Sequence, residues 1–245
     1  MVRQMAEPVN VINALIFLIS TYYCLVSWEK SDEIFFLITL LLVLVGYLGH
    51  MLITKKQKRH IPSDIKTFIF LTSSIAFLTP LLQNLTVSYS YDTILLYVSI
   101  FCIVHCCCYD FQIKTTSEST ALVGSTTSLN AIFFAAILLA SRLSKISSGF
   151  VLLSLNLLVF GFGPYIRHEI KGVSLHAYEA LTIVITCALF CQVLVCSHIM
   201  AVAYVGLISF ICFGTPLFFI YAYSFKNDVR GPWDLPRVKE YQHLD

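Results

Sequence analysis

The sequence predicts an all-α polytopic membrane protein, with about eight transmembrane helices in one bundle. Of its 245 residues, 58% are hydrophobic and only 12% are charged, whereas soluble domains carry about 25% charged residues. The mean hydropathy is +0.80. The apolar residues also fall into long runs, several of them near the roughly 20 residues that a helix needs to cross the hydrocarbon core. These three observations exclude an ordinary water-soluble domain.

We expect a single membrane domain, because no hydrophilic stretch is long enough to fold separately. Residues 1–8 form a short cytoplasmic N-terminal segment, residues 9–223 the transmembrane domain and residues 224–245 a cytoplasmic tail. The first apolar run is too long for the apolar region of a signal peptide, so we take it as a retained span. The eight predicted spans are Val9–Trp28, Ile34–Ile53, Ile65–Leu85, Thr93–Cys108, Ala121–Ala140, Ser147–Ile166, His176–Ser197 and Ile199–Tyr223.

Some span boundaries are less sharply defined than others. The fourth span is short and the last two are nearly continuous. Pro80 is expected to bend or end the third helix, because proline removes a backbone hydrogen bond and crowds the preceding turn. Gly161, Gly163 and Pro164 are expected to end the sixth.

The positive charges predict the orientation of the bundle. Thirteen of the sixteen lysines and arginines lie on one side of the predicted spans, and only Lys30, Arg142 and Lys145 lie on the other. By the positive-inside rule, both termini are cytoplasmic, which agrees with an even number of spans. The basic residues 55–60 serve as a topology signal, or they attract anionic lipid headgroups as well.

The fifth span, within Ser119–Leu143, is the stretch around which we expect the bundle to be organised. Its first half carries small and hydroxyl residues together with Asn130, and its second half carries alanines. Small residues let helix backbones approach closely, and an amide in the bilayer normally bonds to a neighbouring helix. Ser128 and Asn130 serve helix packing alone, or they contact a lipid or a partner subunit. Arg142 follows this helix, where its charge suits the C-terminal dipole.

Two further places carry candidate contact residues. Asp92 and Thr93 lie at the predicted entry of the fourth span, where helix capping alone would explain them. Trp233 and Asp234 lie in a Gly-Pro-Trp-Asp turn of the tail, which places an aromatic ring near the membrane. We expect the tryptophan to dock on a partner or on the membrane interface.

The sequence lacks the groups that catalysis requires. It has no HExxH motif, no paired aspartates, no glycine-rich phosphate loop and no matched His/Cys clusters. The ionisable residues within the spans, among them His105, lie within about a turn of a predicted boundary. The nine cysteines lie almost all within spans and predict no disulfide framework. We therefore expect no catalytic residue, no metal, no cofactor and no nucleic-acid partner.

Three stretches together resemble the C subunit of phosphatidylinositol N-acetylglucosaminyltransferase. They are PLLQNLTVSYSYDTI within Asp64–Ile94, Ser-Leu-Asn at 128–130 with Leu-Ala-Ser-Arg-Leu at 139–143, and Gly-Pro-Trp-Asp at 231–234. The resemblance implies a polytopic, non-catalytic subunit of the endoplasmic reticulum complex that starts glycosylphosphatidylinositol (GPI) anchor synthesis. That complex transfers N-acetylglucosamine from UDP-N-acetylglucosamine to phosphatidylinositol, and the family assigns catalysis to a separate subunit. The implied partners are that catalytic subunit, other membrane subunits and phosphatidylinositol.

The chain departs from the family pattern in two places. Family members carry a longer polar segment before the first span, so either this chain is truncated or the contacts of that segment are lost or supplied elsewhere. Where the family shows His-Asp-Tyr, this chain has Cys108-Tyr109-Asp110-Phe111. Asp110 keeps its place but the histidine does not, and we assign this loop no catalytic role.

Two functions of other classes remain as alternatives. A small-solute transporter or lipid scramblase would need a polar groove, which the uncharged spans disfavour. A membrane glycosyltransferase acting alone is disfavoured because no cluster of carboxylates faces the cytoplasm.

Overall fold

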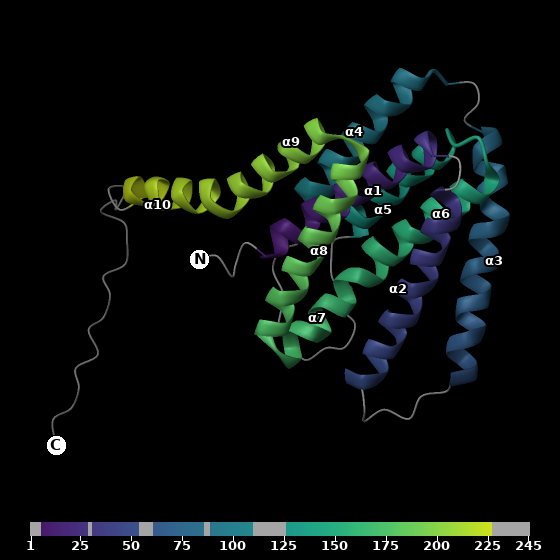
Figure 1. The fold of residues 1–245 in the computed structure, drawn as a ribbon, viewed down its shortest axis with the longest axis horizontal. Coiled ribbons are helices and arrows are strands. Elements are labelled where there is room, and N and C mark those ends of the chain that lie inside the picture. The colour runs from purple at the N-terminus through teal and green to yellow at the C-terminus, as the bar shows by residue number, and fades with distance from the viewer. Residues whose placement is uncertain (1–5, 29–30, 54–60, 86–88, 110–125, 227–245) are drawn as a thin grey trace, which may run out of the picture.

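The computed structural model describes residues 6–28, 31–53, 61–85, 89–109 and 126–226. Within these residues the secondary structure is helical and no strand occurs (Figure 1). The elements are α1 (Ala6–Ser27), α2 (Ser31–Ile53), α3 (Ile61–Leu85), α4 (Tyr91–Cys108), α5 (Thr126–Ala140), α6 (Ile146–Asn156), the π-helical η2 (Leu157–Phe162), α7 (Gly163–Val173), α8 (Leu175–Cys196), α9 (His198–Ser209), the π-helical η3 (Phe210–Gly214) and α10 (Thr215–Lys226).

The eight predicted spans correspond to eight continuous helical runs, because α6–η2–α7 and α9–η3–α10 each continue without a break. Among the described residues, five runs are long and apolar enough to cross a membrane, namely Ala6–Ser27, Tyr91–Cys108, Ile146–Val173, Leu175–Cys196 and His198–Tyr223. Shorter apolar helices occupy Lys66–Leu82 and Thr126–Ala140. The all-helical class and the presence of several membrane-length helices are therefore confirmed.

The structure shows that two helices continue past their prolines, which corrects the expected end at Pro164 and leaves the expected bend at Pro80 as a prediction. Pro80 lies inside α3, which continues to Leu85. Pro164 does not end the sixth helix, which runs on through α7 to Val173. The backbone N–H of Gly163 donates to the carbonyl of Leu158, five residues back. This wider π-helical turn directly precedes Pro164 and lets the helix continue past a residue that has no N–H.

The same arrangement recurs in the last run. The backbone N–H of Thr215 donates to the carbonyl of Phe210, again five residues back, and Pro216 follows. Both π-helical segments thus stand directly before a proline. Between the last two runs, Ser197 has an extended backbone with φ −165° and ψ 131°, which separates α8 from α9.

Among the membrane-length runs of the described residues, α1 has the largest buried share. In α1, 61% of the most apolar 18-residue window is buried, against 17% in α8 and 11% in the α9–α10 run. The α1 helix packs against α2, α5, α6, α8 and η3. The α5 helix buries one face and packs against α1, α3, α4, α6 and η2, and the expectation that the bundle is organised around the fifth span stays a prediction.

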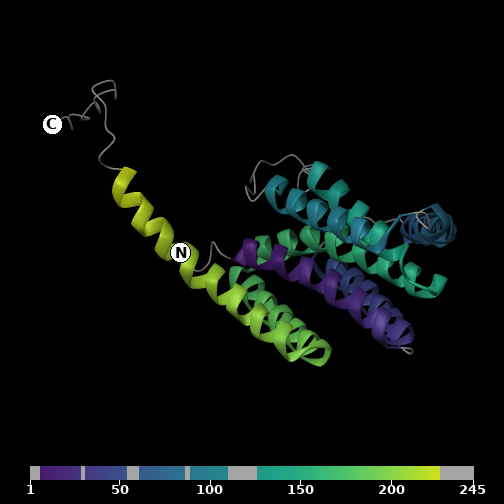
Figure 2. The ribbon, with the colours of Figure 1, turned by 90° about the horizontal axis from the view of Figure 1, so that it is seen from above.

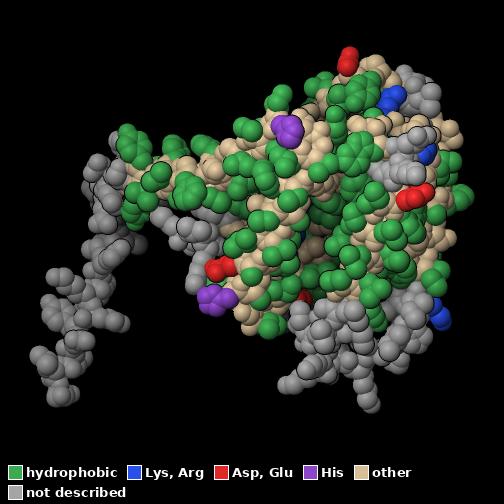
Figure 3. Space-filling model, in the orientation of Figure 1, with side chains coloured by type: hydrophobic (Ala, Val, Ile, Leu, Met, Phe, Trp, Pro, Cys, Tyr) green, Lys and Arg blue, Asp and Glu red, His purple; other side chains and the backbone are tan. Residues whose placement is uncertain are grey.

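The outer surface of the bundle is apolar. Figure 3 shows hydrophobic side chains spread over the face in view, with few charged ones among them. Ile199, Val202 and Phe70 are 82%, 75% and 75% exposed. Large exposed apolar surfaces of this kind are typical of helices that face lipid or a partner chain. The α10 helix projects away from the other helices, as Figures 1 and 2 show.

Candidate functional site

The α4–α5 pair carries most of the predicted contact residues. On α5, Ala135 and Ala136 are fully buried, so a smooth helix face meets its neighbours, as the sequence predicts. The described helix begins at Thr126 and has 15 residues, or about 22 Å of length at 1.5 Å per residue. It is shorter than the predicted span Ala121–Ala140, whose first five residues lie outside the described part of the chain.

One end of this pair brings Thr93 and Arg142 close together in the fold. Ser90 caps α4: its Oγ accepts from the backbone N–H of Thr93 at 3.3 Å and lies 2.7 Å from Thr93 Oγ1. Asp92 lies exposed in the same first turn, where a carboxylate is favourable beside the helix N-terminus. Arg142 Nη2 donates to the backbone carbonyl of Tyr89, just before this turn. Arg142 therefore ties the turn after α5 to the entry of α4.

The opposite end of the pair contains a buried contact between Ser128 and His105. The two residues are 1% and 3% exposed. Ser128 Oγ donates to the carbonyl of His105 at 3.0 Å and lies 2.8 Å from His105 Nδ1. His105 Nδ1 is also 2.9 Å from the carbonyl of Ser128. A carbonyl only accepts, so Nδ1 carries the proton in this arrangement and Nε2 is left as the acceptor nitrogen.

His105 lies within a turn of the end of its span, as the sequence predicts, and the structure adds that the residue is buried. Its ring points at α5. It meets the ring of Phe160 edge-on, with centroids 5.2 Å apart, and that of Tyr109 at 5.8 Å. The sequence does not reveal this contact, because residues 105 and 128 are 23 positions apart and lie on different helices.

A small cavity adjoins the Ser128–His105 contact. It has a volume of about 10 Å³ and is bordered by α1, α4, α5, η2 and α7, with His105, Ser128 and Arg167 among its lining residues. A cavity needs about 10–15 Å³ to hold one water molecule. The space is therefore of water size, and far smaller than a lipid headgroup or a sugar nucleotide.

Asn130 lies apart from this site. It is on the exposed face of α5, on the same side as Phe134, which is 55% exposed. The amide therefore faces outward, away from the buried stripe that contains Ser128. Trp233 and Asp234 lie outside the described residues.

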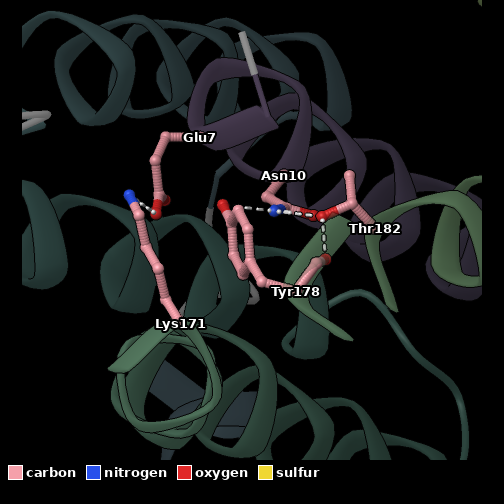
Figure 4. A network of polar contacts seen from close by, with 5 residues as sticks. All are labelled: Glu7, Asn10, Lys171, Tyr178 and Thr182. Atoms are coloured by element: carbon pink, nitrogen blue, oxygen red, sulfur yellow. Dashed lines mark hydrogen bonds and ion pairs between the residues drawn. The ribbon is translucent and has the colours of Figure 1, made fainter. Parts of the chain in front are cut away.

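A second polar group of residues, which the sequence analysis missed, joins α1 to α8 (Figure 4). Asn10 Nδ2 donates to Tyr178 Oη at 3.0 Å and to Thr182 Oγ1 at 3.1 Å. At the start of α1, Glu7 lies 3.6 Å from Lys171 Nζ, and this ammonium also stands 5.3 Å from the centre of the Tyr178 ring. The beginning of α1 is thereby held to α7 and α8 at once.

The contacts between α1 and α8 continue along both helices. Asn13 Nδ2 donates to Thr186 Oγ1 at 2.9 Å, and Asn13 Oδ1 accepts from Tyr204 Oη of α9 at 2.9 Å. Further along, Gln192 Nε2 donates to Ser20 Oγ at 3.0 Å. We call these α1–α8 contacts, from Asn10 to Gln192, the polar ladder. Such bonds between helices are typical of membrane bundles, where water is not available as an alternative partner.

The sequence does contain a signal for the polar ladder. Tyr178, Thr182 and Thr186 recur every four residues, which places them on one face of a helix. Asn10 and Asn13 stand three residues apart and likewise share a face.

Among the described residues, no group of three or more His, Cys, Asp or Glu side chains forms a cluster that could hold a metal ion.

Comparison with known proteins finds a matching family and several similar proteins. The family model for phosphatidylinositol N-acetylglucosaminyltransferase matches residues 1–234. A Dictyostelium discoideum protein, provisionally named as the C subunit of that enzyme, is 34% identical over 78% of this chain and 55% of its own length. The C subunit from Mus musculus is 30% identical over 80% of this chain and 66% of its own length.

A fungal relative gives the same result. The GPI2 subunit of phosphatidylinositol N-acetylglucosaminyltransferase from Schizosaccharomyces pombe is 30% identical over 71% of this chain and 54% of its own length. The chain thus spans between about half and two thirds of the length of these relatives. No solved structure matches it. The resemblance found in the sequence is confirmed, and the chain belongs to the phosphatidylinositol N-acetylglucosaminyltransferase family.

Proposed function

We propose that this chain is a non-catalytic membrane subunit of the complex that transfers N-acetylglucosamine from UDP-N-acetylglucosamine to phosphatidylinositol, the first step of GPI-anchor biosynthesis. The observation that carries the proposal is the family match over residues 1–234, together with relatives whose names make them subunits of that enzyme. The chain acts as a scaffold for the catalytic subunit and contributes to contact with the lipid substrate.

The proposed arrangement in the membrane is eight spans in the endoplasmic reticulum, with residues 1–8 and 224–245 on the cytoplasmic side. Eight continuous helical runs support the number of spans. The clustering of thirteen of the sixteen lysines and arginines on one side of them supports the orientation. In this orientation, the Ser128–His105 contact lies toward the cytoplasm, and the Arg142–Tyr89 contact lies toward the lumen.

The predicted contact residues take different roles in this proposal. Ser128 and Arg142 hold α4 and α5 together at their two ends, and Thr93 takes part in the cap of α4, which supports a packing role. Asn130 and Asp92 are exposed, so we assign them to the surface that meets lipid or another subunit. Trp233 and Asp234 belong to the cytoplasmic tail, and we propose that they dock on the catalytic subunit.

The test is purification of the tagged chain from its own membranes in mild detergent. The preparation is assayed with UDP-N-acetylglucosamine and phosphatidylinositol, before and after a harsher detergent strips off the partners. We expect a glycosyltransferase subunit to copurify with the activity, and the stripped chain to have none. Transfer by the stripped chain would make it an enzyme in its own right. Purification without partners, together with transport of solute or lipid in vesicles, would favour the transporter or scramblase.

A further inference from the structure

Two cysteines meet at one end of the α1–α8 interface. Cys24 of α1 and Cys196 of α8 have their sulfur atoms 2.9 Å apart. Cys24 is only 4% exposed, and Cys196 is the last residue of its helix. The separation is within about 1 Å of a disulfide bond length, which is about 2.05 Å. The structure shows both residues as thiols.

The meeting of these residues follows from the register of the two helices. The α1 and α8 helices run parallel, and hydrogen-bonded residues between them keep a nearly constant separation in sequence. It is 172 residues for Asn10 and Thr182, 173 for Asn13 and Thr186, and 172 for Ser20 and Gln192. Cys24 and Cys196 are also 172 residues apart, so they form the next step of the same polar ladder.

The contact is also held in place by its neighbours. Ser20 lies four residues before Cys24, and Gln192 lies four residues before Cys196. The Ser20–Gln192 hydrogen bond therefore fixes the two helices one turn away from the sulfur atoms. Cys187 and Cys191 lie on the same helix α8 but are exposed, and they serve as internal comparisons.

We propose that Cys24 and Cys196 form an intramolecular disulfide that closes this end of the α1–α8 interface. The inference rests on the orientation given under the proposed function, which puts the ends of α1 and α8 on the lumenal side. Disulfides form and persist in that compartment, and not in the cytosol. The bond would link the first and the seventh helical runs covalently, at the end of the polar ladder.

The chemistry requires a lumenal thiol–disulfide oxidoreductase as the oxidant. A thiolate of this chain attacks the disulfide of the oxidoreductase and forms a mixed disulfide, releasing one of its thiolates. The second cysteine then attacks the mixed disulfide, so that the Sγ–Sγ bond of this chain forms and the other thiolate of the oxidoreductase leaves. Two electrons and the two thiol protons pass to the oxidoreductase, which ends as a dithiol. Because Cys24 is buried in the packed bundle, the exchange takes place before α8 has packed against α1.

The test counts oxidised thiols in the full chain within its membranes. Membranes are denatured in the presence of N-ethylmaleimide to block free thiols, then reduced, and the released thiols are labelled with a mass-tagged maleimide. We expect two labels on the wild-type chain, none on Cys24→Ser or Cys196→Ser, and two on the matched control Cys191→Ser. Mass spectrometry of the non-reduced chain should identify a peptide pair that joins residues 24 and 196.

Absence of labels on the wild-type chain would overturn the proposal, because both thiols would then be free. Labels that persist in Cys24→Ser would also overturn it, because the oxidised pair would be a different one. N-acetylglucosamine transfer is measured in parallel on the chain purified from the same membranes in mild detergent. Transfer that copurifies with an unlabelled chain refutes the disulfide alone, and a disulfide in a chain that carries no transferase refutes the proposed function alone.

Discussion

Ser128 links α5 to α4 through its hydroxyl, which bonds to the backbone of His105 and lies beside the buried imidazole of the same residue. Its Oγ donates to the carbonyl of His105 and lies 2.8 Å from His105 Nδ1. Both side chains are buried, so bulk water does not reach either contact. Loss of a partner in such a place leaves a desolvated polar group, which costs about 1–3 kcal/mol.

We therefore expect Ser128→Ala to lower the free energy of unfolding in mild detergent by about 1–3 kcal/mol. The backbone carbonyl of Ser128 still accepts from His105, which keeps the loss at the lower end of this range. The matched control is Thr127→Ala, because Thr127 is the neighbouring hydroxyl and is exposed. Equal stability of the two variants, measured by denaturant titration, would show that the contact contributes nothing.

The exposed amide of Asn130 belongs to recognition rather than to folding in our account. We expect Asn130→Leu to leave the stability of the isolated chain within about 0.5 kcal/mol of the wild type, as surface substitutions do. We expect it to reduce the amount of partner protein recovered with the chain. Quantitative copurification checks this, with Phe134→Leu on the same face as the comparison. Loss of stability without loss of partners would assign Asn130 to packing.

At the scale of the element, α5 depends on its smooth face. Ala135 and Ala136 are fully buried, and alanine lets the backbones of adjacent helices come close. We expect Ala135→Leu to destabilise the bundle by about 1–3 kcal/mol, the usual effect of overpacking a filled interior. Ala203→Leu is the control, because Ala203 of α9 is exposed. A denaturation midpoint that shifts equally in both variants would contradict the packing described for α5.

Asn13 of the polar ladder also bonds α1 to α9, and this bond allows a direct measurement. Asn13 accepts from the hydroxyl of Tyr204 at 2.9 Å. A double-mutant cycle with Asn13→Ala and Tyr204→Phe should give a coupling free energy of about 0.6–1.7 kcal/mol, as found for hydrogen bonds within membrane bundles. Additive effects in the unfolding free energies, within about 0.3 kcal/mol, would mean that the bond is not energetically significant.

At the scale of the whole molecule, the sequence predicts the helical runs well because hydrophobic length is a local property. The described part of each predicted span lies on one continuous helical run, and only the ends differ. The effect of the prolines is not predictable in this way, because the π-helical turns before Pro164 and Pro216 depend on backbone geometry that composition does not encode. The sequence indicates the polar faces of α1 and α8 but not their pairing. The partners in the polar ladder are about 172 residues apart, and a single sequence does not say which helices are neighbours.

The candidate site is predictable in part for the same reason. The burial of Ser128 follows from the small residues around it, and Arg142 is where the dipole argument places it, after α5. The partners of these residues are His105 and the carbonyl of Tyr89. Both come from other parts of the chain, and the local pattern contains no signal for either.

The role in the transferase is tested by removing this chain from the organism that carries it and measuring the synthesis of N-acetylglucosaminyl-phosphatidylinositol by the isolated membranes. We expect synthesis from UDP-N-acetylglucosamine to be lost while the catalytic subunit is still present, and the wild-type chain to restore it. Unchanged synthesis in membranes without the chain would contradict its assignment as a subunit of the transferase.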